Sequence, residues 1–196
     1  MSPPERGGAA RIRRIVEEAE DVLPRLRPLS AAEFLQLALP PRDMLLEPCL
    51  PEKGLMLVHS IRGIGKTHFA LSLGYAVACS GSFLGFTAPT ARSVIFLDGE
   101  MPAETMQRRL ASVVAGFNSQ PPDPNFFRLL SADITEGGLP DLGTSEGQAE
   151  IDTIIGDAEL IIVDNISTLV RSGKENEAEG WLPVQEWGLA RISHTG

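Results

Sequence analysis

Residues 55–71, Leu-Met-Leu-Val-His-Ser-Ile-Arg-Gly-Ile-Gly-Lys-Thr-His-Phe-Ala-Leu, decide the fold of this 196-residue chain. The first six residues form a short apolar run, which predicts a strand over 55–60 that is buried on both faces. A glycine-containing loop follows, and the apolar residues after it predict a helix over about 66–79. A strand, a tight loop and a helix in this order indicate the start of an α/β unit.

The loop itself carries a phosphate-binding pattern. Residues 60–67 match G-x-x-x-x-G-K-[ST], except that Ser60 stands at the first glycine. Gly63 and Gly65 allow the chain to curl so that successive backbone N–H groups face inward, and the start of the following helix also favours an anion. Lys66 adds a positive charge for the β- and γ-phosphates, and Thr67 offers a hydroxyl to Mg²⁺. The alternative is a chance Gly-Lys-Thr in an ordinary loop.

The predicted nucleotide-binding residues are Ser60, Ile61, Arg62, Gly63, Ile64, Gly65, Lys66, Thr67 and His68. Most of them contribute backbone amides, since the amides from Arg62 to Thr67 line the curl. His68 lies next to the expected nucleotide but could also serve only in packing.

Further strands alternate with helices along the chain. Apolar runs predict strands over 93–97, 126–130 and 160–164, and helices are expected over about 102–115, from a cap at Ser145 onward, and over about 181–190. Such alternation predicts a mainly parallel sheet with helices on both faces, a three-layer α/β/α fold.

Two carboxylates follow predicted strands at the sheet edge where the loop lies. Asp164 ends an apolar strand and is expected to hold Mg²⁺ together with Thr67, unless it is only a turn residue. Glu100 is placed to polarise an attacking water, or alternatively only to put a negative charge near the start of the next helix. Asp98 is expected to be structural. Asn165 could orient water or sense the γ-phosphate, or it could form a turn.

Three segments together resemble a known family: HSIRGIGKTHFAL at 59–71, VIFLDGEM at 94–101 and LIIVDNISTL at 160–169. They are similar to the RecA-like P-loop ATPases, often called AAA-family ATPases, and most similar to the hexameric helicases of plasmid and phage replication. The resemblance covers roughly residues 40–190. It implies ATP and Mg²⁺ as cofactors, a homo-hexamer, single-stranded DNA as a partner, Glu100 as catalytic base and Asp164 as the magnesium-associated residue.

The resemblance also sets expectations about domain limits. It implies a partial core over 43–196, because no apolar strand follows Asp164 where the family has further strands. One of those strands would lie between the strand ending at Asp164 and the strand before the phosphate loop. Residues 1–42 are expected to be a separate helical and irregular segment. It would hold a first helix around Ile12 and a second over 31–39, which opens with the capping box of Ser30 and Glu33.

Composition narrows the functional classes. The chain carries 17 basic and 26 acidic residues, a net charge of −9, and the excess of acidic over basic residues falls after residue 130. The negative net charge excludes a uniformly basic surface for non-specific nucleic-acid binding, so any DNA contact would be local. Two widely spaced cysteines argue against a disulfide framework or zinc site. We see no secretory signal or membrane segment and expect a cytoplasmic protein.

Three functions remain open at this point. The leading hypothesis is an ATPase that drives DNA replication or unwinding. The second is a small-molecule kinase or another P-loop NTPase, and the third is a nucleotide-binding interaction module that does not hydrolyse ATP.

Overall fold

The computed structural model describes residues 27–39, 41–172 and 181–194, and it divides into two units between Pro41 and Arg42. In the first unit, helix α2 spans Ala31–Leu35. Ser30 accepts from the backbone N–H of Glu33, and the Glu33 side chain accepts from the backbone N–H of Ser30, so the predicted capping box is confirmed. The helix ends at Leu35, earlier than the predicted 39. The helix expected around Ile12 lies outside the described residues.

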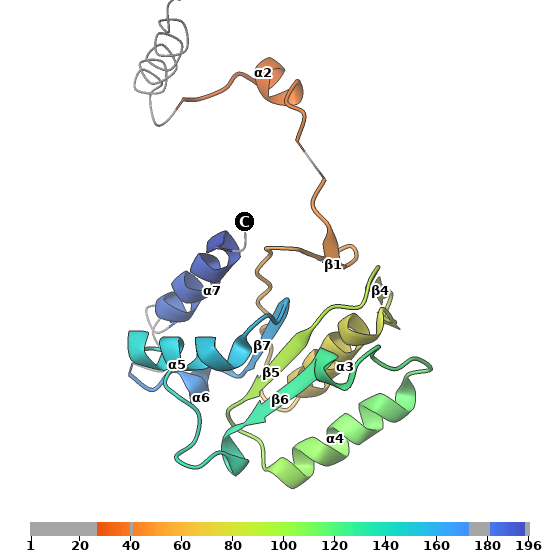
Figure 1. The fold of residues 1–196 in the computed structure, drawn as a ribbon, viewed down its shortest axis with the longest axis vertical. Helices are drawn as coiled ribbons and strands as arrows, with labels where there is room; N and C mark the ends of the chain where they lie inside the picture. Colours follow the sequence, from red (N-terminus) through yellow and green to blue (C-terminus); the bar gives the residue numbers. More distant parts are fainter. Residues whose placement is uncertain (1–26, 40, 173–180, 195–196) are drawn as a thin grey trace, which may run out of the picture. The chain divides into compact units, whose positions relative to one another are not determined.

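The second unit is built on a three-stranded parallel sheet (Figure 1). The central strand β5, Val94–Asp98, is buried throughout and pairs with β6, Phe127–Ser131, on one side and β7, Leu160–Asp164, on the other. The register aligns Asp98 with Ser131 and with Asp164. The carboxyl ends of all three strands therefore meet at one edge, as predicted from the alternation of strands and helices.

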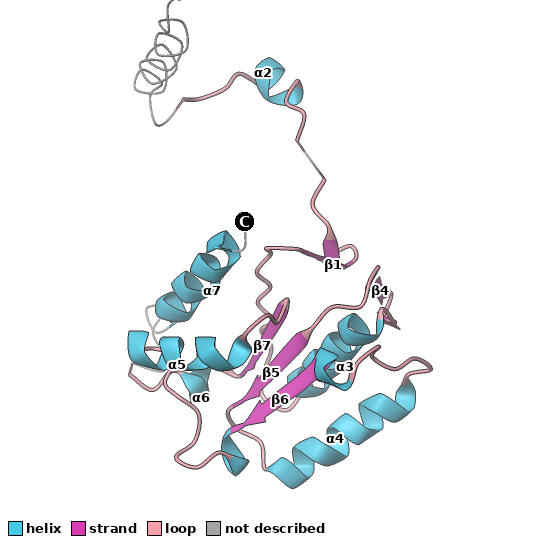
Figure 2. Ribbon diagram, viewed as in Figure 1, coloured by secondary structure: helices cyan, strands magenta, loops and turns pink. Residues whose placement is uncertain are grey.

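Helices cover both faces of this sheet, which confirms the predicted three-layer α/β/α fold (Figure 2). Val94 and Phe96 face α3, Lys66–Cys79, and Phe96 also packs with residues of α4, Ala103–Gly116. Ile95 and Leu97 face the opposite layer. That layer comprises α5, Ser145–Ile155, α6, Ile166–Leu169, and α7, Leu182–His194. Alternate residues of one buried strand thus enter two separate cores.

Helix α3 approaches the sheet closely at one glycine. A Cβ atom built on Gly74 would lie 2.6 Å from Cδ1 of Ile162 on β7 and 3.2 Å from Cε2 of Phe127 on β6. Because glycine has no side chain, the helix can pack against the strands at this point without displacing either residue. This contact helps to fix the helix that carries Lys66 and Thr67 above the sheet.

The strand predicted over 55–60 is absent. Residues 54–60 have no strand assignment, and Leu55 and Leu57 are 49% and 61% exposed. Apolar character alone does not make a strand, because a strand also needs a neighbour to bond its backbone groups. Among the described residues the sheet ends at β7, and the segment before the phosphate loop has no pairing partner. The prediction that this run is buried in the sheet was therefore wrong.

Smaller elements complete the second unit. An antiparallel pair joins β1, Met44–Leu46, to β2, Leu50–Pro51, and another joins β3, Ser82–Phe83, to β4, Phe86–Thr87. Short 3₁₀ turns lie at Pro124–Phe126 and Ala132–Ile134. None of these elements was predicted. Leu45, Leu46 and Leu50 are buried against α3 residues, so the lead-in expected to be irregular contributes to the core.

Two local predictions need correction. Helix α5 is capped by Thr144, whose hydroxyl accepts from the backbone N–H of Gly147, and the predicted cap Ser145 is its first helical residue. Helix α7 extends to His194, beyond the expected end at 190. The predicted loop over 171–180 falls mostly outside the described residues.

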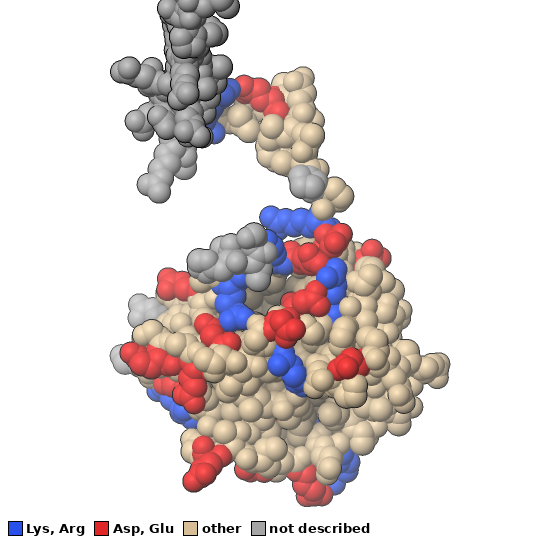
Figure 3. Space-filling view, viewed as in Figure 1, with Lys and Arg blue, Asp and Glu red and all other residues tan. Residues whose placement is uncertain are grey.

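The charges of the second unit are mixed. Figure 3 shows basic and acidic side chains interspersed over the end of this unit that carries β1, without a large field of one sign on that face. Arg92, for example, contacts Glu52 and Glu159, each at 2.6 Å. None of the described helices is long and apolar enough to cross a bilayer.

Candidate functional site: a phosphate loop beside two carboxylates

The loop before α3 has the backbone shape that its glycines predict. Gly63 and Gly65 have φ angles of 85° and 101°, in the region that favours glycine, and a Cβ at either residue would meet open space. Glycine is therefore required at these two positions because any other residue would be strained at these φ angles, although its side chain would have room. The loop leads directly into α3, with Gly65 as the N-cap residue.

The N-terminus of α3 offers unpaired donors. Gly65 has no side chain to cap the helix, and the first turn carries no acidic residue. The first backbone N–H groups of an α-helix have no partner within the helix, and the helix dipole makes this end positive. The N-terminus of α3 and the curled loop together are therefore suited to bind an anion.

Lys66 holds the two sides of the loop together. Its Nζ atom donates to the carbonyl oxygens of Ser60 at 2.8 Å and Ile61 at 3.1 Å. The ammonium group thus lies against the first residues of the loop, six and five positions earlier in the chain. An ammonium group has three donors, so one is left for a further acceptor.

Thr67, in the first turn of α3, and Asp164, the last residue of β7, are close neighbours. The Thr67 hydroxyl lies close enough to the Asp164 carboxylate to lower its pKa. Burial raises the pKa of the Asp164 carboxyl and the nearby charges of Asp98 and Glu100 raise it further, whereas Thr67 and Lys66 lower it. A hydroxyl and a carboxylate are hard oxygen ligands of the kind that Mg²⁺ binds, with water and phosphate filling the remaining positions. In the described part of the chain, no three His, Cys, Asp or Glu residues form a metal cluster by themselves.

Asp98 shapes the turn that carries Glu100. It is 1% exposed, and one carboxylate oxygen accepts from the Ser131 hydroxyl at 3.2 Å. The other accepts from the backbone N–H groups of Glu100 and Met101 at 3.3 and 3.1 Å. Asp98 therefore fixes the backbone just after β5 and has a structural role, as the sequence indicated.

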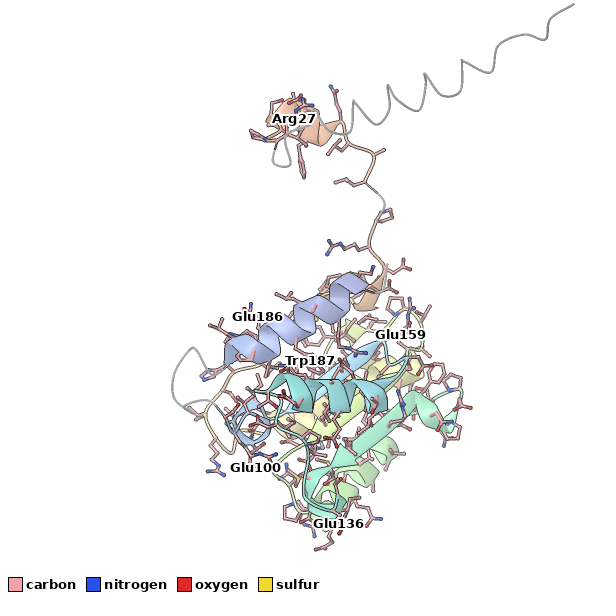
Figure 4. The ribbon with its side chains drawn as sticks, turned by 60° about the vertical axis from the view of Figure 1, so that its left-hand side comes forward. Arg27, Glu100, Glu136, Glu159, Glu186 and Trp187 are labelled. Carbon is pink, nitrogen blue, oxygen red and sulfur yellow. The ribbon has the colours of Figure 1, made fainter. Side chains whose placement is uncertain are left out.

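Glu100 itself lies at the carboxyl edge of the sheet. Figure 4 shows it at the opposite end of the sheet from Glu159, which precedes β7. One of its carboxylate oxygens accepts from Nη2 of Arg62 at 2.7 Å, and the other accepts from the side-chain amide of Asn165. Its side chain is 43% exposed. The carboxylate is therefore tied both to the phosphate loop and to the turn after β7.

Asn165 is held firmly by its own turn. It is the N-cap residue of α6, and its side-chain oxygen accepts from the backbone N–H of Thr168 at 3.1 Å and from the Ser167 hydroxyl at 2.6 Å. The sequence left a choice between a turn-forming and a water-orienting Asn165. The structure shows the turn, and adds a contact to Glu100 that the sequence did not reveal.

A comparison with known proteins gives the family. A family model described as an AAA domain matches residues 19–194, most of the chain. This chain belongs to the AAA domain family. The family is one of nucleotide-binding ATPases of the P-loop type, and the α/β/α core described above agrees with this. No curated protein matches the chain.

The structure of this AAA domain brings most of the predicted site residues to one edge of the sheet. Ser60 and Ile61 contact Lys66, Arg62 contacts Glu100, and Thr67 contacts Asp164. Ile64 is 65% exposed at the loop tip, and His68 is exposed on the first turn of α3. Sequence reasoning used only the backbone of Arg62 and missed its side chain. The available signal was an arginine in a loop whose neighbours are apolar or glycine.

Proposed function

We propose that this AAA domain binds ATP with Mg²⁺ at the loop formed by residues 60–67 and hydrolyses it. The observation that carries the proposal is that Thr67, in the first turn of the uncapped helix α3, lies close enough to Asp164 to lower the pKa of that carboxyl. It sets two oxygen ligands suited to Mg²⁺ next to a positive helix end suited to phosphate.

Each residue then has a role that its position supports. The backbone amides of Arg62 to Thr67 and the Lys66 ammonium hold the phosphates, and Thr67 and Asp164 hold the metal ion, which neutralises phosphate charge. Glu100 accepts a proton from the water that attacks the terminal phosphate. Catalysis in such a site rests on positioning and charge stabilisation, with little covalent chemistry for the protein itself.

Binding tests the first half of the proposal. A fluorescent ATP analogue is titrated into the chain with and without Mg²⁺, and we expect saturable binding that Mg²⁺ strengthens. Lys66→Ala removes a charged donor and should weaken binding at least about tenfold. Arg108→Ala removes an exposed cation on α4 and should leave binding unchanged. Equal binding by the Lys66 and Arg108 variants would disprove the site.

Phosphate release tests the second half. We expect Glu100→Gln to bind ATP and to lose turnover, since the amide cannot accept the proton. One observation favours the alternative of a non-hydrolysing module: both oxygens of Glu100 already accept hydrogen bonds. If the unchanged chain binds ATP but releases no phosphate, the non-hydrolysing function is the correct one.

The partner of the ATPase is proposed from the sequence resemblance. We propose that hydrolysis is coupled to single-stranded DNA in a homo-hexamer, as in the replicative helicases. Stimulation of phosphate release by single-stranded DNA would support this partner, whereas a product that depends on an added small-molecule acceptor would favour a kinase. Sedimentation with the ATP analogue and Mg²⁺ measures whether hexamers form.

A further inference from the structure

The ion pair between Arg62 and Glu100 connects two segments that the proposed chemistry needs to act together. Arg62 lies in the phosphate loop, 38 residues before Glu100, and its Nη2 atom is 2.7 Å from Oε1 of Glu100. The contact therefore joins the loop that would hold phosphate to the residue that would activate water.

The two donors to Glu100 differ in how firmly they are held. Asn165 is fixed by its capping bonds to Ser167 and Thr168. The Arg62 side chain is 93% exposed, and among the described residues its only hydrogen bond or ion pair is with Glu100. Arg62 can therefore leave Glu100 without breaking other contacts, and Asn165 cannot.

A phosphate group and the Glu100 carboxylate can both bind the Arg62 guanidinium group. A guanidinium group binds either anion through the same planar fork of N–H donors. A general base contacts its water within about 3 Å, and the water contacts the reacting phosphorus at about 3–3.5 Å. If Glu100 is that base, the guanidinium group that contacts it lies near the position of the terminal phosphate.

We propose that Arg62 is a positioning residue that moves from Glu100 to the terminal phosphate of a bound nucleoside triphosphate. While Arg62 holds Glu100, one oxygen of the carboxylate is occupied by the guanidinium group. When the phosphate takes the guanidinium group, that oxygen becomes available to water, and Asn165 keeps the other in place. The inference rests on the proposed function, since it requires a triphosphate at the loop.

A double-mutant cycle isolates this exchange. The dissociation constant of a fluorescent, non-hydrolysable ATP analogue with Mg²⁺ is measured for the unchanged chain, Arg62→Ala, Glu100→Gln and the double variant. Glu100→Gln releases Arg62 and removes a negative charge near the phosphates. In the Arg62→Ala background only the charge effect remains. The effect of Glu100→Gln on the dissociation constant with Arg62 present, divided by its effect in the Arg62→Ala background, therefore measures the exchange.

We expect Glu100→Gln to tighten binding about two- to fivefold more when Arg62 is present than in the Arg62→Ala background, the range for an exposed ion pair. Arg62→Ala alone should weaken binding. Arg62→Lys in place of Arg62 should give a smaller ratio of the two Glu100→Gln effects, because lysine lacks the planar fork of N–H donors. With ADP, which has no terminal phosphate at that position, the ratio should be near one. Arg108→Ala combined with Glu100→Gln is the matched control and should show no coupling.

The possible failures are distinguishable. If the unchanged chain does not bind the analogue, the proposed function fails and the inference with it. If it binds in a Lys66-dependent manner but the ratio is one, or is as large with ADP, the proposed function stands and the role of Arg62 is overturned. Thermal unfolding of each variant verifies that it is folded.

Discussion

Asp164 opposes folding at the position where we propose that a metal ion binds. Its carboxyl is partly enclosed between α3 and β7, and its neighbours include the negative charges of Asp98 and Glu100. The Thr67 hydroxyl and the Lys66 ammonium compensate only in part, since the pKa of Asp164 remains raised. The Asp164 charge therefore costs stability, and the metal ion proposed to bind there would offset this cost.

The raised pKa of Asp164 predicts how stability depends on pH. The folded chain holds this proton more tightly than the unfolded chain, whose Asp pKa is near 3.8. The contribution is therefore fully present below pH 3.8 and is lost as the pH rises through the folded-state pKa. We expect Asp164→Asn to increase the free energy of unfolding at pH 7 without metal, and to have a smaller effect near pH 4.

Urea denaturation at several pH values measures the Asp164 prediction. Asp157→Asn is the matched control, because that carboxylate is 98% exposed, and it should change little at any pH. A loss of stability in Asp164→Asn at pH 7, or a gain that is equal at pH 4, would contradict the assignment of the raised pKa to this residue.

At the scale of elements, α3 depends on its close approach to β7 at Gly74. A Cβ there would lie 2.6 Å from Cδ1 of Ile162. Gly74→Ala gains helix propensity but forces Ile162 to shift, so we expect a net loss of about 1 kcal/mol in the free energy of unfolding. Ile162→Val removes Cδ1, and the double variant should recover most of that loss.

Gly116 provides a control for the Gly74 prediction. Gly116, at the end of α4, has open space around a built Cβ and no positive φ, so Gly116→Ala should be neutral or slightly stabilising. Denaturant titration of the four chains in the cycle supplies the coupling energy. Additive effects of the two α3–β7 substitutions would mean that Gly74 is not required for this contact.

Elements with strong local signals were predictable from sequence. Strands β5 and β7 and helices α3 and α4 fall within one residue of their predicted bounds, because apolar periodicity and flanking glycine or proline mark them. The segment 55–60 shows the limit of this reasoning. Its apolar run is as strong as that of β7, but whether it pairs depends on a neighbouring strand elsewhere in the chain, which local sequence does not reveal.

The site was predictable for a different reason. The carboxyl ends of parallel strands share one edge of a sheet, so Glu100 and Asp164 were expected there because each follows or ends a predicted strand. The contacts of Arg62 and Asn165 with Glu100 were not predictable. They depend on the conformation of two turns and on side-chain reach, and no spacing rule encodes either of these.

At the scale of the whole molecule, the core belongs to the second unit. Among the described residues, every member of the three apolar clusters lies at or after Leu45, and α2 has no buried residue. We therefore expect Leu35→Ala, at an 83% exposed residue of α2, to unfold within about 2 °C of the unchanged chain, since even 1 kcal/mol shifts a domain of this size by only about 2–4 °C. Circular dichroism during heating measures this midpoint. A fall of more than about 5 °C would correspond to a loss of more than about 1 kcal/mol, which the exposed residues of α2 do not account for. It would mean that α2 unfolds together with the core.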